Sequence, residues 1–363
     1  MEMDAKNKVD LITRNAVEII TREDAEEIFS TNPSPKGYLG FEPSGQFHVG
    51  WMIWVNAFKD MMNAGIKMTL LEATWHAWIN NKLGGDMRKI QLCATYIEHC
   101  LTALGVDLSK VELVKADNLV DGKEYWDGLI RINKQLSLSR VKRAVTIMGR
   151  KEDEASLDFS MLLYPSMQVE DIFFMGMDFA LGGMDQRRAH VLAREVAPAL
   201  GKRKPVAVHT PLLSGLQGSG RMDTSLKGAD SEAALIEGKM SKSKPESCIF
   251  VHDSPAEIKA KIAASFCPPK IIEGNPVMEI AKYILMRDKP LHISRPAKYG
   301  GDIEFATADE LMGTYSEGKI HPLDLKNAVS EALAERLAPV REYFAKFPEA
   351  SDSLREFRSP QKV

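Results

Sequence analysis

Two short stretches of this 363-residue chain carry residue types that can handle phosphate groups. The first, YLGFEPSGQFHVGW (residues 38–51), passes from a predicted strand through Pro43 and Gly45 to a helix predicted to begin near His48. Free backbone N–H groups at a helix start favour anions, His48 can donate to a phosphate, and the absent side chain at Gly50 lets a nucleotide approach. A histidine at a helix start is also commonly a cap or a packed residue, so both interpretations of this stretch stay open.

The second stretch, EGKMSKSKPES (residues 237–247), is cationic and rich in small hydroxyl residues. Its three lysines, Lys239, Lys242 and Lys244, alternate with serines between Gly238 and a proline. Such a loop can hold a polyphosphate, and a plain surface turn can have the same composition.

Composition narrows the class of protein. Hydrophobic residues make up 44% and charged residues 27% of the chain, as in ordinary globular proteins of two or three domains. No apolar run reaches the roughly 18 residues of a membrane helix, and the polar N-terminus has no apolar signal core, so we expect a cytoplasmic protein without a membrane partner. The net charge of −3 argues against wholesale coating of nucleic acid. The four cysteines form no CxxC pair, so no metal site is expected.

The elements that must position these stretches alternate between strands and helices. Buried strands are predicted at 37–43, 67–74, 111–116 and 206–213, with helices at 49–65 and 87–105. This order predicts an α/β fold with a doubly wound, Rossmann-like parallel sheet, whose ligands sit at the carboxyl ends of the strands. After about residue 254 the pattern is mostly helical, with Ser254 and Pro255 at a helix start and Pro339 bending or splitting the last long helix.

Taken together, the two stretches resemble the signature of class I aminoacyl-tRNA synthetases: an HxGx helix start on the first βα unit and a KMSKS-type loop about 190 residues later. YLGFEPSG, GKMSKSK and the segments 164–195 and 321–329 resemble, more narrowly, tyrosyl-tRNA synthetases of the archaeal and eukaryotic type, over roughly residues 35–345. The resemblance implies a homodimer that activates tyrosine with ATP, with Mg²⁺ on the phosphates and no tightly bound prosthetic group, and then charges tRNA(Tyr).

The resemblance also implies a role for each motif residue. The tyrosine phenol is expected between Tyr38 and Asp171, with the α-ammonium held by Tyr164, Gln168 and Gln186 and with His76 lining the pocket. An unpaired carboxylate in the apolar run MQVEDIFFMGM is costly, which independently favours a partner for Asp171. The residues expected at ATP are Gly40, Glu42, His48, Gly50, Gly183, Asp185, Lys239, Met240, Ser241 and Lys242, and the catalytic candidates among them are His48, Lys239 and Lys242.

Ordinary structural roles remain as alternatives at these positions. They are a core aromatic at Tyr38, one packed helical turn at 164–168, a helix-starting turn at 182–187 and a packed strand-end residue at His76.

The expected tRNA contacts lie in two regions. Residues 131–151 hold seven Lys or Arg and no acidic residue, which is either a solvated helix face or, by the resemblance, the inserted segment (about 117–163) that meets the acceptor stem and the dimer partner. The phosphate candidates there are Arg140, Lys142 and Arg143. Tyr299 and His321 are expected to stack on the first anticodon base and Asp324 to accept its hydrogen bonds, although His321 is also a plausible plain helix start. The implied domains are an N-terminal helical extension at 1–34, a catalytic domain at 35–250 with its loop at 238–244, and a helical anticodon-binding domain at 251–363.

Two positions depart from the usual pattern of that family. Trp51 stands where a second histidine is usual, and Thr74 stands where an aspartate is common. Lys242 stands where archaeal members often have serine. Our hypothesis is that this lysine compensates for the two replacements and redistributes the contacts to the ATP phosphates. These departures keep open a catalytically weak paralogue that acts as an RNA-binding or regulatory protein. Tryptophanyl-tRNA synthetase is disfavoured by the pair Tyr38 and Asp171, which suits a phenol, and a nucleotidyltransferase is disfavoured by the helical second domain.

Overall fold

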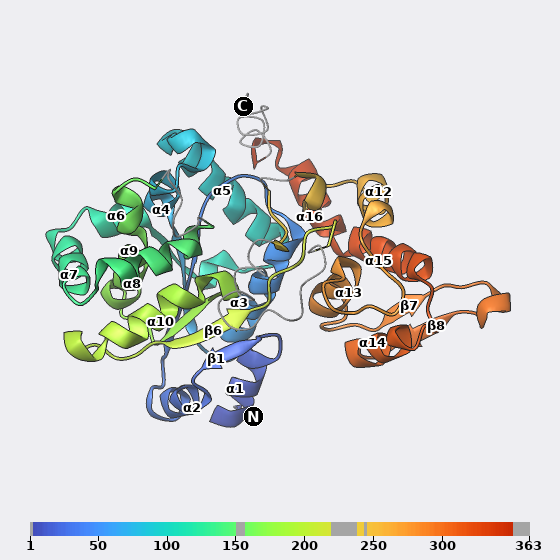
Figure 1. Ribbon diagram of the computed structural model, residues 1–363, viewed down its shortest axis with the longest axis horizontal. Coiled ribbons are helices and arrows are strands. Elements are labelled where there is room, and N and C mark those ends of the chain that lie inside the picture. The colour runs from blue at the N-terminus through green and yellow to red at the C-terminus, as the bar shows by residue number, and fades with distance from the viewer. Residues whose placement is uncertain (1–2, 150–156, 219–237, 243–244, 351–363) are drawn as a thin grey trace. The chain divides into compact units, whose positions relative to one another are not determined.

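A computed structural model of the chain forms two compact units (Figure 1). The described residues are 3–149, 157–218, 238–242 and 245–350. Unit 1 comprises Met1–Gly45, Trp54–Pro211 and Pro348–Val363, and unit 2 comprises Gln46–Ile53 and Leu212–Phe347. None of the helices in the described part of the chain is long and apolar enough to cross a membrane.

A six-stranded sheet forms the centre of unit 1, in the order β1-β6-β5-β2-β3-β4. Its strands are β1 (Glu18–Ile20), β2 (Lys36–Phe41), β3 (Lys67–Glu72), β4 (Glu112–Lys115), β5 (Phe179–Gly183) and β6 (Val206–Thr210). All neighbours are parallel except β1, which pairs antiparallel with β6. The predicted doubly wound parallel sheet is therefore confirmed, and its switch point lies between β2 and β5, where Tyr38 pairs with Ala180. The strands β1 and β5 were not predicted.

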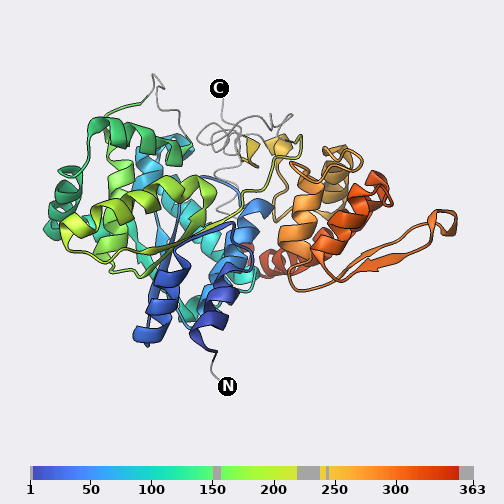
Figure 2. The ribbon, with the colours of Figure 1, turned by 60° about the horizontal axis from the view of Figure 1, so that its bottom comes forward.

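Helices pack around this sheet (Figures 1 and 2). They are α1 (Ala5–Thr13), α2 (Arg22–Thr31), α3 (Met52–Asn63), α4 (Thr74–Ile79), α5 (Met87–Ala103), α6 (Ala116–Val120), α7 (Lys123–Asn133), α8 (Leu138–Ala144), α9 (Tyr164–Phe174) and α10 (Arg187–Val196). The predicted helices at 49–65 and 87–105 correspond to α3 and α5. The strand predicted to reach Thr74 was too long: β3 ends at Glu72, so His76 is a helical residue of α4 and not a strand-end residue.

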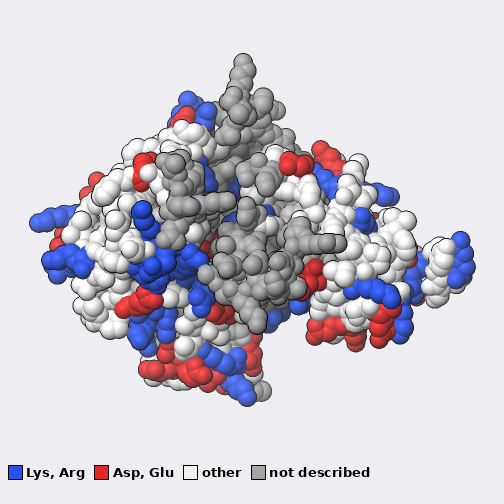
Figure 3. All heavy atoms as spheres, in the orientation of Figure 1, with Lys and Arg blue, Asp and Glu red and all other residues white. Residues whose placement is uncertain are grey.

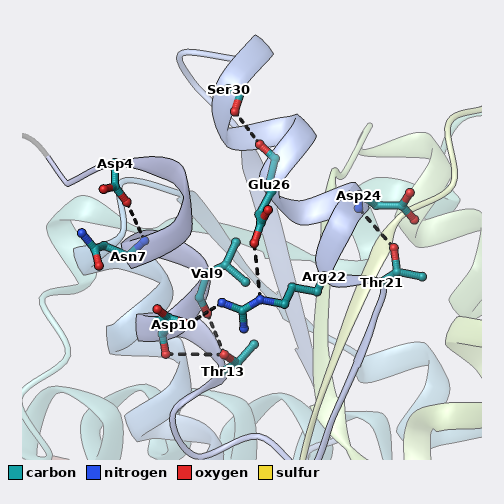
Figure 4. A network of polar contacts seen from close by, with 10 residues as sticks. All are labelled: Asp4, Asn7, Val9, Asp10, Thr13, Thr21, Arg22, Asp24, Glu26 and Ser30. Carbon is teal, nitrogen blue, oxygen red and sulfur yellow. Dashed lines mark hydrogen bonds and ion pairs between the residues drawn. The ribbon is translucent and has the colours of Figure 1, made fainter.

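The N-terminal segment begins with two capped helices (Figure 4). Asp4 accepts the N–H of Asn7 to start α1, and Thr21 caps α2 in the same way. Arg22 bridges Asp10 of α1 and Glu26 of α2. Because such surface pairs contribute at most about 1 kcal/mol, the buried apolar faces of the two helices supply most of their attachment.

Glu72, the last residue of β3, is a buried carboxyl group with only 3% of its surface exposed. Burial first, and then a hydrogen bond and the charge of Glu98, raise the Glu72 pKa; Asp117 raises it further and Lys115 opposes the shift. A carboxyl group with a raised folded-state pKa stabilises the fold below its unfolded pKa of about 4.3, and this contribution is lost as the pH rises through the folded pKa.

The variant Glu72→Gln keeps the shape of this side chain and removes its charge. We expect the wild type to lose unfolding free energy relative to the variant between pH 5 and pH 9, by about 1.4 kcal/mol for each unit by which the fold raises the pKa. Urea unfolding at pH 5, 7 and 9 measures this difference. Glu335→Gln, at an exposed site of a helix in unit 2, is the control and should show no such trend. A difference between Glu72→Gln and wild type that stays constant with pH would contradict the prediction.

Unit 2 is mostly helical, as predicted. Its elements are η1 (Val49–Trp51), η8 (Pro245–Ser247), α12 (Pro255–Ala264), α13 (Pro276–Ile280), a π-helical turn η9 (Ala281–Leu285), β7 (Leu291–Ile293), η10 (Ala297–Tyr299), β8 (Ile303–Phe305), α14 (Ala308–Ser316), α15 (Pro322–Arg336) and α16 (Ala338–Lys346). Ser254 and Glu257 form a reciprocal capping box at the start of α12. Pro339 splits the last helix, because α15 ends at Arg336 and α16 begins at Ala338. The antiparallel pair β7–β8, orange in Figure 1, was not predicted.

Candidate active site

The first cluster of site residues lies on one face of α9 in unit 1. Tyr164, Gln168 and Asp171 are spaced by four and three residues, so a helix brings them onto one side. Pro165 sits in the first turn, where its missing N–H costs no helical hydrogen bond. This face meets the buried Tyr38 of β2, whose pKa is raised by burial and by the charge of Asp171 and lowered by a hydrogen bond with Gln168. The fold therefore brings together the residues predicted around the phenol.

Asp171 is surrounded by polar partners in a buried setting. The Tyr125 hydroxyl donates to its Oδ1 over 2.8 Å, and Nε2 of His76 lies 3.2 Å from its Oδ2. Burial raises the pKa of Asp171 to about 8; the hydrogen bond from Tyr125 lowers it and the charge of Glu170 raises it. Burial also lowers the pKa of His76 to about 4. Burial therefore disfavours the charged form of both groups, which opposes an ion pair between His76 and Asp171.

Gln168 presents an unsatisfied acceptor to this cluster. Its Oε1 is shielded from solvent and has no hydrogen-bond partner among the residues that the structure describes. A buried acceptor without a donor costs about 1–3 kcal/mol. A ligand whose N–H group donates to this oxygen would remove that cost. The amide of Gln186, by contrast, already donates to the carbonyl of Ile147 over 3.2 Å.

Glu42, predicted at ATP, is tied to the same cluster. Its Oε1 accepts from the Asn80 side-chain amide at 2.9 Å and from the Tyr164 hydroxyl at 3.4 Å, and its Oε2 lies 3.5 Å from Nζ of Lys82. Asn80 is buried and also donates to the carbonyl of Met148. Sequence reasoning missed Asn80, Lys82 and Tyr125, because none of them lies in a recognised motif.

The turn after β5 carries Gly183, Asp185 and Gln186. The strand ends at Gly183 and a 3₁₀ turn, η6 (Met184–Gln186), leads into α10. A Cβ at Gly182 would lie 2.9 Å from Cβ of Gln186, closer than real Cβ atoms come, and 3.0 Å from Cε1 of His190, a tight contact. Gly182 is therefore required for the packing of the turn itself. The helix-starting turn considered as an alternative is present.

A partly buried chain of polar groups lies next to this turn. Nδ1 of His190 lies 3.0 Å from Nε2 of His209, whose Nδ1 lies 2.8 Å from Oε2 of Glu18. Arg187, at the start of α10, donates to both carboxylate oxygens of Glu18. The edge strand β1 is thereby tied to the helix that follows the turn. This chain of contacts gave no sequence signal, because Glu18 and His209 are 191 residues apart.

His48 forms the centre of a second cluster, in unit 2. It occupies the N-cap position of η1 without a side-chain capping hydrogen bond, so of the two ordinary roles considered for it, that of a packed residue fits the structure. The residue is 6% exposed, and its Nδ1 has no hydrogen-bond partner in the described part of the chain. A Cβ at Gly50 would lie 3.0 Å from two atoms of the imidazole, so Gly50 makes room for this ring. Burial and the charges of Lys242 and Lys239 hold the His48 pKa well below its usual range, which keeps the ring neutral.

The lysine-rich stretch runs beside residues 213–215 in unit 2. The N–H of Gly215 donates to the carbonyl of Gly238, and the N–H of Met240 donates to the carbonyl of Leu213 over 2.6 Å. Met240 is 3% exposed, and this buried side chain anchors the stretch. Lys239, Ser241 and Lys242 flank that anchor. Lys244 lies outside the described residues.

The basic candidates of the inserted segment all lie on α8. Arg140 donates to both carboxylate oxygens of Glu195, with a closest distance of 2.6 Å. Arg140 and Arg143 line a hollow of about 400 Å³, and Lys142 belongs to the last turn of α8. Figure 3 shows Lys and Arg side chains gathered over the region of α8 and α10. A phosphate at Arg140 would have to compete with Glu195.

The anticodon candidates occupy exposed positions of unit 2. Tyr299 is 61% exposed in η10, between the strands β7 and β8. His321 caps α15: its Nδ1 accepts the N–H of Leu323 over 3.2 Å, so the alternative of a helix start is confirmed for this residue. Asp324 lies in the first turn of the same helix. The predicted base contacts of all three remain predictions.

Comparison of the chain with known proteins shows which family it matches. Residues 30–338 match the family model of tRNA synthetases class I (W and Y). The tyrosine–tRNA ligase of Aeropyrum pernix is 50% identical over 343 residues, 94% of each chain, and that of Saccharolobus solfataricus is 49% identical over 355 residues, 98% of this chain and 97% of the relative.

Solved structures agree with the sequence comparison. The tyrosyl-tRNA synthetase of Pyrococcus horikoshii in complex with L-tyrosine has a TM-score of 0.88 at 41% identity, covering 97% of this chain and 100% of the other. The Aeropyrum pernix enzyme has a TM-score of 0.87 at 44% identity, covering 98% and 99%. The chain therefore belongs to the class I tRNA synthetases for tryptophan and tyrosine, and within them to the archaeal type of tyrosyl-tRNA synthetase.

Proposed function

We propose that this chain is a tyrosine–tRNA ligase, which activates tyrosine with ATP and transfers the tyrosyl group to tRNA(Tyr). The observation that carries the proposal is the buried polar cluster of unit 1, where Tyr38 and Asp171 meet beside the unpaired acceptor of Gln168. A pocket that reads a hydroxyl with buried polar groups rejects the analogue without it, because those groups would be left unpaired.

In this proposal the phenol of tyrosine hydrogen-bonds with Tyr38 and Asp171. Tyr125 and His76 contact the carboxyl group of Asp171 and position it. The α-ammonium supplies the donor that Oε1 of Gln168 lacks, with Tyr164 and Gln186 beside it.

The proposed first step joins tyrosine to AMP. A carboxylate oxygen of tyrosine attacks the α-phosphorus of ATP, the bond to the β-phosphate oxygen breaks, and pyrophosphate leaves. The carboxylate is already ionised at pH 7, so the step needs no general base and depends on positioning and charge stabilisation. His48, Lys239 and Lys242 act on the phosphates, and ATP enters as its Mg²⁺ complex. The further ATP contacts proposed are Gly40, Glu42, Gly50, Gly183, Asp185, Met240 and Ser241.

In the proposed second step a terminal ribose hydroxyl of tRNA(Tyr) attacks the tyrosyl carbonyl and AMP leaves. Arg140, Lys142 and Arg143 contact acceptor-stem phosphates. Tyr299 and His321 stack on the first anticodon base, and Asp324 accepts its hydrogen bonds. We further propose a cytoplasmic homodimer whose chains comprise an extension at 1–34, a catalytic domain at 35–250 with an insertion at about 117–163, and an anticodon-binding domain at 251–363.

Tyrosine-dependent ATP–pyrophosphate exchange on the purified protein tests the first step, with phenylalanine and tryptophan as matched controls. We expect exchange with tyrosine alone, followed by charging of tRNA(Tyr) in a second assay. Exchange with tryptophan would instead assign the chain to the sister specificity. If no amino acid supports exchange, the replacements Trp51 and Thr74 have abolished amino-acid activation. The alternative function, an RNA-binding paralogue, would then be the better assignment.

A further inference from the structure

Trp51 and Lys242 are in direct contact in unit 2. Nζ of Lys242 lies 3.8 Å from the centroid of the Trp51 indole ring, within the range of a cation–π interaction. The ammonium nitrogen is shielded from solvent, which strengthens an electrostatic attraction of this kind. Of the cation–π pairs in the described part of the chain, this one has the shortest distance.

Trp51 is itself held in place by its neighbours. Its ring packs edge-on against Phe47, with centroids 5.1 Å apart and an interplanar angle of 81°, and lies 5.8 Å from the ring of His48. The N–H of Trp51 donates to the carbonyl of His48, which closes the turn η1. The indole is therefore a fixed surface next to the imidazole that is proposed to contact phosphate.

A lysine side chain is a mobile group, and ordering it costs conformational entropy. A ring that orders the ammonium group before a ligand binds lowers the entropic cost of placing that charge beside the transition state. Indole is the best aromatic partner for a cation. Two of the differences from the family pattern noted in the sequence, the tryptophan at 51 and the lysine at 242, thus meet in space as one pair.

We propose that Trp51 is a positioning residue for Lys242: its indole ring holds the ammonium group beside His48, ready for the phosphates of ATP. The inference rests on the proposed function, which places Lys242 at those phosphates. It adds that the activity of Lys242 depends on Trp51, and that the two residues act as a unit.

A double-mutant cycle in tyrosine-dependent ATP–pyrophosphate exchange tests this dependence. Trp51→Leu should lower kcat about 5- to 30-fold, which corresponds to the strength of a partly to fully desolvated cation–π contact, and should leave the KM for tyrosine unchanged. Trp51→Phe, which keeps a ring, should lose less. In a Lys242→Gln background, Trp51→Leu should change kcat by less than about twofold, because the charge that the ring positions is gone.

The matched control is Tyr283→Leu, which removes the ring below Lys282 in η9, a pair outside the proposed site. Its exchange activity should equal that of wild type. Equal effects of Trp51→Leu with and without Lys242, or a faster exchange in Trp51→Leu, would overturn the proposal. If Trp51→Leu does not fold, the cycle is run with Trp51→Phe.

A second measurement needs no activity. In protein made with ¹³C-labelled lysine, the Cε–H signal of Lys242 should be shifted upfield by the ring current of Trp51, and it is assigned by its loss in Lys242→Arg. The signal should return to the position of ordinary lysines in Trp51→Leu. An unshifted signal in wild type overturns the inference even if exchange is normal, whereas a shifted signal without any exchange counts against the proposed function alone.

Discussion

Lys239→Ala is expected to lower the kcat of tyrosine-dependent ATP–pyrophosphate exchange by about 10²- to 10³-fold, the usual effect of removing one group that stabilises transition-state charge. Lys239 lies next to the buried anchor Met240, and its charge contributes to the depressed pKa of His48, so a phosphate at this cluster would meet both residues. The proposed tyrosine contacts all belong to unit 1, whereas Lys239 belongs to unit 2. The dissociation constant for tyrosine should therefore stay within about twofold of wild type.

The measurement pairs the exchange assay with equilibrium dialysis of radiolabelled tyrosine. Lys259→Ala removes an exposed lysine of α12 and serves as the matched control, with no expected change in either quantity. Lys239→Arg keeps the charge and should restore part of the rate. If tyrosine affinity and exchange rate fell together in Lys239→Ala, the assignment of this lysine to ATP would be wrong.

Asp171→Asn is the change with the largest expected effect on specificity. Tyrosyl-tRNA synthetases as a class reject phenylalanine by about 10⁵, and Asp171 is the buried group proposed to read the hydroxyl that distinguishes the two substrates. We expect kcat/KM for tyrosine to fall by about 10²-fold, the equivalent of one strong hydrogen bond, and kcat/KM for phenylalanine to change little. Discrimination between the two amino acids should drop by the same factor.

Glu170→Gln provides a matched control on the same helix. Glu170 is also a buried carboxyl group, burial raises its pKa to about 7, and it packs beside Gly128 of α7. Because its charge raises the pKa of Asp171, Glu170→Gln controls for an electrostatic effect on Asp171 that leaves the Asp171 side chain in place. Exchange kinetics with tyrosine and with phenylalanine give kcat/KM for both amino acids in each variant. A parallel loss for both amino acids in Asp171→Asn would show that this residue supports the fold of the pocket and does not read the hydroxyl.

Features that depend on local spacing could be predicted from the amino-acid sequence. The interval from Tyr164 to Asp171 puts both residues and Gln168 on one side of a helix, whatever the rest of the chain does. Pro339 splits the last helix and Ser254 starts another, because a missing N–H and a capping hydroxyl act within one turn. The alternation of apolar strands and helices predicted the parallel sheet for the same reason, since strand and helix periods are properties of short segments.

The tertiary structure alone decided which distant groups meet. Tyr125 reaches Asp171 across 46 residues of chain, and Trp51 meets Lys242 from about 190 residues away. The spacing of residues along the sequence indicates neither contact, because each depends on how whole elements cross and pack. The short strands β1 and β7 were missed for a related reason: three residues carry too little periodicity, and only pairing with a partner strand makes them strands. The raised pKa of Asp171 likewise follows from burial, which no local pattern specifies.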